Sequence, residues 1–318
     1  MSAVEQLEWV PPMLATLTEE RFSDPGWVYE RKLDGERCLV YHTADRTELY
    51  SRNRKELNGS YPEIVDALAA QSGTFVADGE IVAFDGNITS FARLQGRMQI
   101  GDPAVARSSG ITVYLYLFDL IKLDSHDLTG LELRRRKSLL KNLLTFDGPL
   151  RYTVHRNNNG EAYWEQACRS GWEGVIAKRA DAPYTHGRSK DWLKFKCVTE
   201  QEFVIGGYTD PQGSRRGFGA LLIGYYEQGN LRYAGKVGTG YDHETLDRLS
   251  RQLKDLEQDH PPFTSGSLPR SRVHWVRPEL VGQVGFSEWT RDGQLRHPRF
   301  QGLRRDKPPR DVVRERAQ

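Results

Sequence analysis

The sequence predicts an α+β protein of two domains, with a boundary near residue 200. A chain of 318 residues exceeds the commonest size of a single domain. Up to the boundary, short strand-like segments alternate with helical ones. Beyond residue 202 we expect short strands and a single helix, a pattern typical of a small OB-type β-barrel. The expected arrangement is an α+β domain over 1–200 and a barrel domain over 201–318.

The composition is that of a globular protein, with 38% hydrophobic and 28% charged residues. No apolar run approaches the roughly 18 residues of a membrane helix, and the first residues lack the basic and apolar regions of a signal peptide. We therefore expect a cytoplasmic protein that binds no membrane. Cys38, Cys168 and Cys197 are few, odd in number and far apart, which predicts free thiols and neither a disulfide framework nor a zinc site.

The first domain is expected to begin with strands at 27–30 and 38–42, which are rich in β-branched and aromatic residues. Asp34-Gly35 is a turn signal between them. The run 113–121 is almost entirely apolar and predicts a buried central strand. Further strands are expected at 48–54, which ends in a polar turn, and at 75–84, 172–179 and 192–196.

Helices are predicted at 62–68, 91–98 and 161–168, the first of them with Pro62 at its first position. Another helix should follow Thr129-Gly130-Leu131-Glu132, which fits a capping box and precedes leucines at helical spacing. In the second domain we expect strands at 203–208, 220–226, 231–237, 273–276 and 280–286, and one helix at 242–256.

Lys32 is the residue around which the candidate chemistry gathers. It directly precedes the Asp34-Gly35 turn, where two strands splay apart and an amine can reach a ligand. An amine attacks only when uncharged, and a free lysine has a pKa of about 10.4, so nearby cations or a metal must lower that value. The alternative is an exposed hairpin with a solvated lysine, because the short pattern alone is weak.

Three further clusters could serve Lys32. Asp78-Gly79-Glu80 could hold a sugar hydroxyl or a divalent metal, and Glu173 offers another oxygen ligand; otherwise these are exposed carboxylates at strand ends. Lys194 and Lys196 share one strand face by the period of two. Two amines there repel unless an anion lies between them, which favours a phosphate chain over the alternative of outward lysines on an edge strand. Residues 291–316 hold nine basic and four acidic side chains, which indicates a solvated face or phosphate binding.

Taken in order, these stretches resemble the motifs of the covalent nucleotidyltransferases, most closely the ATP-dependent DNA ligases. Each motif is weak alone, but the resemblance covers nearly the whole chain in family order. The matching stretches are 32–37 (motif I), 51–53 (Ia), 78–80 (III), 117–120 (IIIa), 173–178 (IV), 193–196 (V) and 304–307 (VI). With Pro12-Met13-Leu14-Ala15, the pattern is most similar to bacterial ligase C and to the ligase module of the end-joining ligase D.

The resemblance implies an ATP-grasp-like nucleotidyltransferase core followed by an OB fold, with ATP and Mg²⁺ (or Mn²⁺) as cofactors. Lys32 would attack the α-phosphate of ATP and hold AMP covalently. AMP would then pass to the 5′-phosphate of a nick, and the 3′-hydroxyl would displace it. The implied partners are nicked duplex DNA and repair or end-joining proteins, and we expect a monomer in the bacterial cytoplasm, associated with the nucleoid.

The resemblance also implies a role for each site residue. Phe118 would stack on adenine, Glu30 would lie beside its edge, Arg37 and Glu80 would hold the ribose, and Lys178, Lys194 and Lys196 complete the nucleotide-binding set. Glu173 and Glu80 are the candidate metal ligands. Arg305, Asp306 and Lys307 would orient the leaving pyrophosphate, Arg52 would grip the 5′-phosphate, and Asp34 would serve the steps at the nick.

The chain departs from larger ligases because it has no room for the helical DNA-binding domain that precedes their core. We therefore expect the two core domains to grip DNA, with the loop 211–217 as an added contact. An RNA-joining or RNA-capping enzyme remains an alternative, because such enzymes share the lysine motif. The non-enzymatic alternative is a barrel-containing nucleic-acid binder in which Lys32 is inert.

Overall fold

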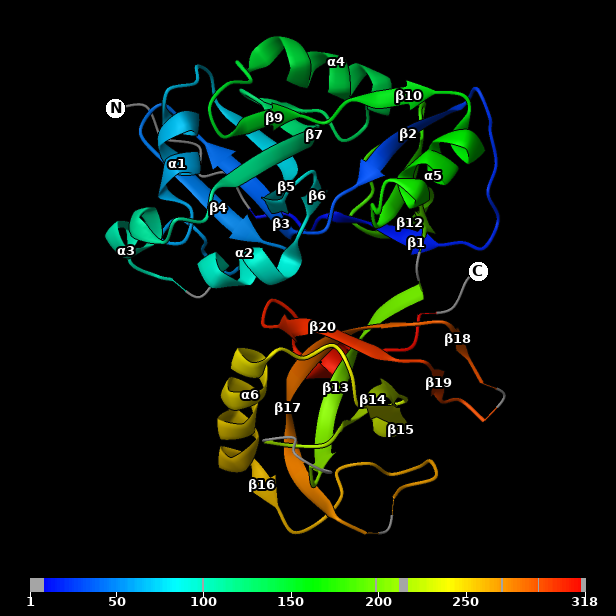
Figure 1. Cartoon of the computed structure of the whole chain (residues 1–318). Coiled ribbons are helices and arrows are strands. Elements are labelled where there is room, and N and C mark those ends of the chain that lie inside the picture. Colours follow the sequence, from blue (N-terminus) through cyan, green and yellow to red (C-terminus); the bar gives the residue numbers. More distant parts are fainter. Residues whose placement is uncertain are drawn as a thin grey trace. The chain divides into compact units, whose positions relative to one another are not determined.

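The computed structural model describes residues 9–98, 100–197, 199–211, 217–269, 271–290 and 292–315 (Figure 1). The chain divides into two compact units, with the boundary between residues 197 and 198. In the described part of the chain, no helix has both the length and the apolar character needed to cross a membrane.

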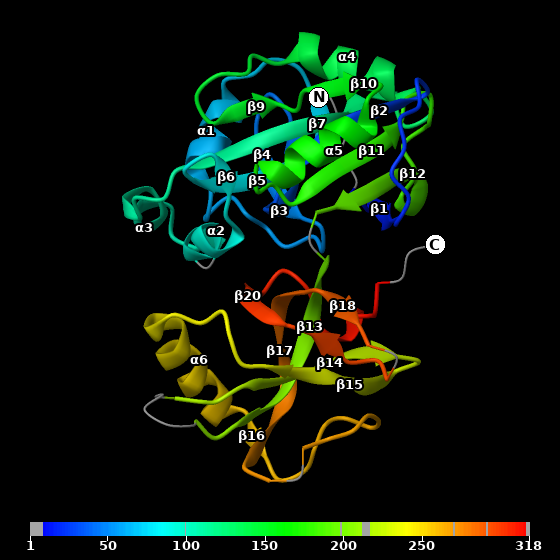
Figure 2. The ribbon, with the colours of Figure 1, turned by 45° about the vertical axis from the view of Figure 1, so that its right-hand side comes forward.

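Two sheets form the first unit. One has the strand order β1-β12-β11-β2-β10, and Figure 2 shows its first four strands side by side. The other has the order β4-β3-β5-β7-β8, with β6 paired to β5 and β9 paired to β7. The bounds are β1 Met13–Leu17, β2 Trp27–Lys32, β3 Glu36–His42, β4 Thr47–Ser51, β5 Phe75–Asp85, β6 Ile88–Thr89, β7 Val113–Leu123, β8 His126–Asp127, β9 Leu150–Tyr152, β10 His155–Asn157, β11 Gly174–Arg179 and β12 Gly187–Lys196.

Strands β2 and β3 belong to different sheets, although only 33–35 separate them. Strand β2 pairs with β10 and β11, whereas β3 pairs with β4 and β5. A hairpin with a solvated lysine is therefore wrong for this segment, which instead carries the chain from one sheet to the other. The crossing is tight at Gly35, where a Cβ atom would lie 2.1 Å from the carbonyl oxygen of Ile81.

Most helices of this unit lie against these sheets (Figure 1). Helices α1 (Pro62–Ala69), α2 (Phe91–Met98) and α4 (Leu133–Leu143) pack on the seven-stranded sheet, and α5 (Gly160–Arg169) packs on β11 and β2. The short α3 (Pro103–Ser108) contacts α1. Leu115 and Leu117 of β7 are fully buried, which confirms the prediction of a central apolar strand.

The predicted capping box before α4 is wrong. The helix begins at Leu133 and its N-cap, Glu132, makes no side-chain capping bond. The backbone N–H groups of Leu133 and Arg134 donate to the carbonyl oxygens of Ala182 and Ala180, at 3.0 and 3.1 Å. Because a neighbouring segment satisfies these two helical donors, the helix needs no capping side chain at this end.

The second unit contains a six-stranded sheet of order β15-β14-β13-β17-β16, with β20 also paired to β17. The bounds are β13 Thr199–Thr209, β14 Leu221–Glu227, β15 Asn230–Val237, β16 Glu257–Gln258, β17 Val273–Phe286 and β20 Arg299–Arg304, with a separate pair formed by β18 (Glu288–Trp289) and β19 (Leu295–Arg296). The two strands predicted at 273–276 and 280–286 form one long strand, β17. The pairings among described strands leave the sheet open, so the structure shows half a barrel and no closed one.

Among the described residues of this unit, α6 (His243–Asp255) is the one α-helix, in agreement with the sequence prediction. Its N-cap is Asp242, whose side chain accepts a hydrogen bond from the backbone N–H of Thr245 at 2.7 Å. Leu246, Leu249 and Leu253 of α6 recur at helical spacing and join the buried apolar core of the unit. A short 3₁₀ helix at Pro309–Asp311 follows β20.

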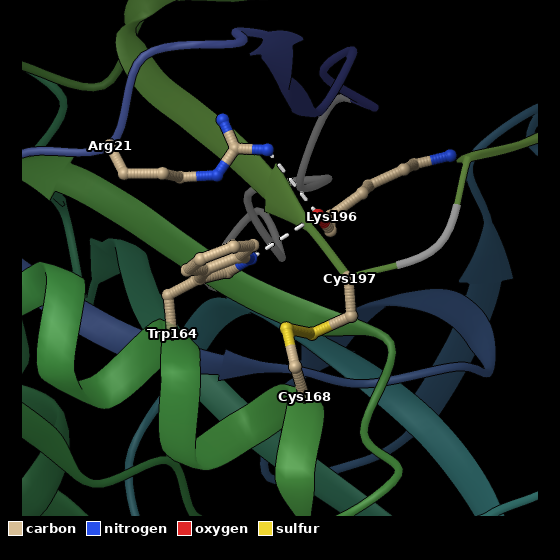
Figure 3. The surroundings of a disulfide bond; sticks show 5 residues. All are labelled: Arg21, Trp164, Cys168, Lys196 and Cys197. Carbon is tan, nitrogen blue, oxygen red and sulfur yellow. Dashed lines mark hydrogen bonds between the residues drawn. A yellow bond between two sulfur atoms is a disulfide. The ribbon is translucent and has the colours of Figure 1, made fainter. Parts of the chain in front are cut away.

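Figure 3 shows a disulfide between Cys168, in the last turn of α5, and Cys197, directly after β12. The prediction of three free thiols is therefore wrong for two of them, and Cys38 is a free, buried thiol. The end of β12 is held further by Trp164 and Arg21, which both donate to the carbonyl oxygen of Lys196, at 3.2 and 3.3 Å. The Lys196 side chain points away from the disulfide.

We predict that replacing Cys168 and Cys197 together by serine lowers the free energy of unfolding of the first unit by about 3 kcal/mol under oxidising conditions. The cross-link closes a loop with a sequence separation of 29, which restricts the unfolded chain. Urea unfolding of the wild type and of the double variant measures the difference. Addition of dithiothreitol should remove it, and an equal stability of both proteins in oxidising buffer would contradict the prediction.

Candidate active site

Lys32 lies at the end of β2, beside Glu173, the residue that precedes β11. The Lys32 Nζ and a carboxylate oxygen of Glu173 form an ion pair, and the two side chains are 17% and 11% exposed. Gly174 is the register partner of Lys32 on one side and of Lys196 on the other. Three stretches that are distant in the sequence therefore meet at one end of the five-stranded sheet.

Gly174 permits this meeting. Its φ angle is 149°, and a Cβ atom there would lie 2.1 Å from the carbonyl oxygen of Phe195. A side chain would therefore push β11 away from β12. The half-buried Lys194 pairs in register with Ile176 of β11. Because Lys194 and Lys196 are two residues apart on β12, their side chains share one face of the strand, as the sequence predicts.

A cluster of aromatic rings and cations, called the slot below, lies between β7 and β12. The rings of Phe118 and Trp192 meet edge to face with their centroids 6.0 Å apart. The Lys178 Nζ lies 4.1 and 4.0 Å from these two centroids, and the Arg37 guanidinium lies 4.8 Å from that of Phe118. Rings surrounded by fixed cations provide a stacking surface for a planar heterocycle.

Arg37 is fixed on one side of this slot by Asp78. Its Nε and Nη2 donate to the two carboxylate oxygens at 2.5 and 2.6 Å, and the hydroxyl of Tyr184 donates to Asp78 Oδ2 at 2.6 Å. Burial alone would lower the pKa of Arg37, but the charge of Asp78 holds that pKa above its ordinary value. Glu80 is the register partner of Arg37 across β3 and β5.

Glu30 lies on the inner face of β2 and is 2% exposed. Its two carboxylate oxygens pair with Lys137 Nζ at 2.5 Å and Lys178 Nζ at 2.6 Å. Burial alone would raise the pKa of Glu30, but the two ammonium groups hold it below its ordinary value. In turn, burial lowers the pKa of Lys178 to about 8, although Glu30 opposes that shift. The site thus contains one carboxylate between two buried cations.

Lys137 is a site residue that the sequence prediction missed. It also donates to the carbonyl oxygens of Thr153, at 3.0 Å, and Phe118, at 3.4 Å, so it ties α4 to the slot. Its position contained a signal, because Lys137 and Arg136 fall at helical spacing among the buried leucines of α4. Charged residues on such a face predict buried partners, and Arg136 indeed pairs with the fully buried Asp119 at 2.7 Å.

The remaining predicted site residues lie elsewhere. Asp34 Oδ2 accepts a hydrogen bond from the backbone N–H of Phe91 at the start of α2, at 3.4 Å, and Arg52 is half-buried directly after β4. Arg305, Asp306 and Lys307 belong to the second unit: Arg305 is exposed, Asp306 pairs with Arg304 at 2.8 Å, and Lys307 pairs with Glu202 at 3.2 Å. Positions 212–216 of the predicted DNA-contact loop lie outside the described residues.

Among the described residues, no group of three or more His, Cys, Asp or Glu side chains could enclose a metal ion. This arrangement is compatible with Mg²⁺, which usually takes one or two protein carboxylates and completes its shell with substrate phosphates and water. Glu173, next to Lys32, supplies one such carboxylate.

Two family models match the chain. The "ATP dependent DNA ligase domain" matches residues 12–196, and the "ATP dependent DNA ligase C terminal region" matches residues 214–307. Among solved structures, a mycobacterial DNA ligase D complexed with ATP and MES is similar with a TM-score of 0.69 and 34% identity, over 96% of this chain and 98% of that one.

Curated relatives include two multifunctional non-homologous end joining proteins named LigD. The protein from Pseudomonas aeruginosa is 37% identical over 97% of this chain and 37% of its own length. The protein from Mycobacterium tuberculosis is 36% identical over 98% of this chain and 41% of its own length. A DNA ligase from Natronomonas pharaonis is 32% identical over 89% of this chain and 52% of its own length. The chain thus spans about two fifths of the two LigD relatives.

We predict that Glu30→Gln lowers the free energy of unfolding by about 3–5 kcal/mol, because it leaves two buried ammonium groups without their anion. Adding Lys137→Met should recover part of this loss, since it removes the like-charge repulsion. Urea unfolding of the single and double variants measures the coupling. The exposed carboxylate of Asp66, paired with Arg107, is a matched control, and Asp66→Asn should cost less than about 1 kcal/mol. Additive effects of the two substitutions in the site would contradict the prediction.

The lowered pKa of Lys178 predicts a pH dependence of stability. Between the folded value of about 8 and the ordinary value of 10.5, the unfolded chain binds more protons at this position, so stability rises with pH. Relative to Lys178→Met, the free energy of unfolding of the wild type should increase by about 2 kcal/mol between roughly pH 7.5 and pH 9.5. Urea unfolding of both proteins at the two pH values tests this. A stability difference that does not change with pH would contradict the lowered pKa.

Proposed function

Because the chain belongs to the ATP-dependent DNA ligase family, we propose that it seals nicks between a 5′-phosphate and a 3′-hydroxyl in duplex DNA. The reaction would proceed through lysyl-AMP and DNA-adenylate intermediates. The observation that carries this proposal is the meeting of Lys32, Glu173 and Lys196 through the shared register partner Gly174. A nucleophilic amine, a carboxylate and a phosphate-binding cation are the groups that adenylyl transfer requires.

In the first step, Lys32 Nζ attacks the α-phosphate of ATP. A nitrogen–phosphorus bond forms, the bond to the bridging oxygen breaks, pyrophosphate leaves and the amine releases a proton. The ion pair with Glu173 orients Lys32 but favours its charged form, so the amine must lose this partner before it attacks. The cations Lys194 and Lys196 favour the neutral amine and stabilise negative charge that develops on the phosphates.

Mg²⁺, or Mn²⁺ in its place, would neutralise phosphate charge when it is bound together with ATP. Glu173 is the proposed ligand, with Glu80 as a second candidate. If Glu173 turns from Lys32 toward a metal, one carboxylate forms the ion pair in the resting enzyme and binds the metal in the reacting complex.

The slot between β7 and β12 is the proposed adenine site, with the base stacked on Phe118. Glu30 would lie beside the edge of the base, and Lys178 would complete this end of the slot. Arg37 and Glu80, which are register partners, would hold the ribose. The fixed pairing of Arg37 with Asp78 supports this role, because a positioned guanidinium loses little freedom when a nucleotide binds.

In the second and third steps, the DNA 5′-phosphate oxygen displaces Lys32 from the AMP phosphorus, and the 3′-hydroxyl then displaces AMP. We propose that Arg52 grips the 5′-phosphate and that Asp34 serves these steps. Arg305, Asp306 and Lys307 would orient the pyrophosphate of the first step.

The proposed domains are an adenylation domain over 1–200 and an OB-fold domain over 201–318, and the half-barrel sheet of the second unit supports the latter.

We further propose a role in bacterial end-joining repair, in the cytoplasm and at the nucleoid, with a monomeric enzyme and other repair proteins as partners. The names of the LigD relatives support this proposal. The two family models and the Natronomonas pharaonis relative are DNA ligases by name, which favours DNA ligation over RNA ligation or capping.

We predict that incubation with α-labelled ATP and Mg²⁺ leaves label covalently bound to the wild-type protein after denaturing electrophoresis. A chase with nicked DNA should release the label as a sealed strand appears. Lys32→Ala should abolish labelling, because it removes the amine that is proposed to form the bond to the α-phosphate. Lys190→Ala is a matched control, since it removes an exposed lysine of the same unit and should keep full labelling. Labelling of Lys32→Ala, or label from GTP in preference to ATP, would contradict the proposal.

A further inference from the structure

A hollow of about 710 Å³ opens on the first unit, outside the set of residues proposed to bind ATP or the nick. Its volume falls within the range of roughly 300–1,000 Å³ that is usual for small-molecule sites. It is formed by the end of β2, the turn between β5 and β6, strands β7 and β9, and the segment after α5. The lining residues are Arg31, Phe84, Gly86, Asn87, Tyr114, Tyr116, Arg151, Ser170 and Trp172.

Arg31 provides the first cation of this hollow. It directly precedes Lys32 on β2, so by strand alternation its side chain lies on the opposite face from the nucleophile. Its guanidinium lies 4.3 Å from the ring centroid of Trp172 and 5.8 Å from that of Phe84. Nη2 donates to the carbonyl oxygen of Asn87 at 3.2 Å, while the buried Nε has no hydrogen-bond partner among the described residues. A buried donor without a partner favours binding of an acceptor.

Arg151 provides the second cation. Its guanidinium lies 4.7 Å from the ring centroid of Tyr114, which itself meets Phe84 edge to face at 5.8 Å. Nη1 donates to the carbonyl oxygens of Gly148 and Leu150, each at 2.7 Å. These bonds fix the guanidinium through one nitrogen, so its remaining N–H groups can meet a ligand.

The charge of the hollow is unbalanced. None of its lining residues is acidic, and no described carboxylate forms an ion pair with Arg31 or Arg151. The cations of the adenine slot differ, because Arg37, Lys137 and Lys178 all pair with carboxylates. Unpaired guanidiniums among aromatic rings are the combination that binds single-stranded nucleic acid, with bases stacked on rings and phosphates on cations.

We propose that this hollow binds one unpaired nucleotide of a single-stranded DNA segment, with its base against the aromatic rings and its phosphate between Arg31 and Arg151. A free nucleotide has the same base and phosphate as a nucleotide within a DNA strand. We choose the DNA strand as the ligand because of the proposed function. The site would let the enzyme hold a single-stranded extension at a broken DNA end while Lys32 works on the opposite face of β2.

The test uses the full chain and a short single-stranded DNA that contains 2-aminopurine, whose fluorescence falls when the base stacks. Arg151→Ala should weaken binding about 5- to 10-fold and reduce the salt slope by about 0.7, the value for one phosphate contact on a single strand. Tyr114→Leu should weaken the fluorescence change at saturation. Arg135→Ala is the matched control, since it removes an exposed arginine of the same unit and should leave both readouts unchanged.

Equal binding by the wild type and Arg151→Ala, with circular dichroism showing that the variant is folded, would overturn the proposal. The mononucleotide of 2-aminopurine separates the two sources of ligand. The proposal is supported if the protein binds the mononucleotide weakly, in a way that depends on Arg151, and binds the single-stranded DNA more tightly. If the mononucleotide and the single-stranded DNA bind with equal affinity, a DNA strand is not the ligand. Lysyl-AMP formation is measured separately, so its loss would reject the ligase assignment without touching the Arg151 readout.

Discussion

The crossing of the chain from β2 to β3 is the constraint on which the first unit depends. Within 33–35 the backbone leaves one sheet and enters the other, and Gly35 lies against the carbonyl of Ile81 with no space for a side chain. Lys32 therefore ends one sheet just before Arg37 enters the other. Gly174 pairs in register with Lys32, so Glu173, the residue before Gly174, lies beside the amine of Lys32. No long flexible segment is needed to bring the two side chains together.

The buried charges of this region explain why such close placement is useful. Asp78, the pair of Arg136 with Asp119, and Glu30 with its two lysines are removed from water, and Arg37 keeps only 18% of its side chain exposed. Their burial has a desolvation cost that well-packed apolar residues would avoid. Our hypothesis is that these charged groups hold one another in the orientation that a bound nucleotide requires. A nucleotide that enters the slot meets cations already desolvated and oriented by their carboxylates, so little reorganisation is needed when it binds.

The sequence predicted those features whose cause is local. A nearly continuous apolar run predicted β7, and the stretch 242–256 was predicted as the helix that is now α6. The order of motifs pointed to the candidate groups around Lys32. It could not show that β2 and β3 join different sheets, because a turn signal says nothing of strand partners. The disulfide depends on how β11 and β12 bring Cys197 to the end of α5, which cysteine spacing does not encode. Likewise, the start of α4 depends on carbonyl groups about 50 residues away.

The two sites that combine cations with aromatic rings differ in a way that separates their ligands. In the slot between β7 and β12, carboxylates neutralise most of the cationic charge, so its stacking surface suits an uncharged base. The hollow beside Arg31 has two guanidiniums and no paired carboxylate, so it suits a base only together with its phosphate. Arg31 and Lys32 are neighbours on β2 with side chains on opposite faces. One strand can therefore contribute both to the chemistry and to the grip on a DNA end, provided that the two ligands enter from opposite sides.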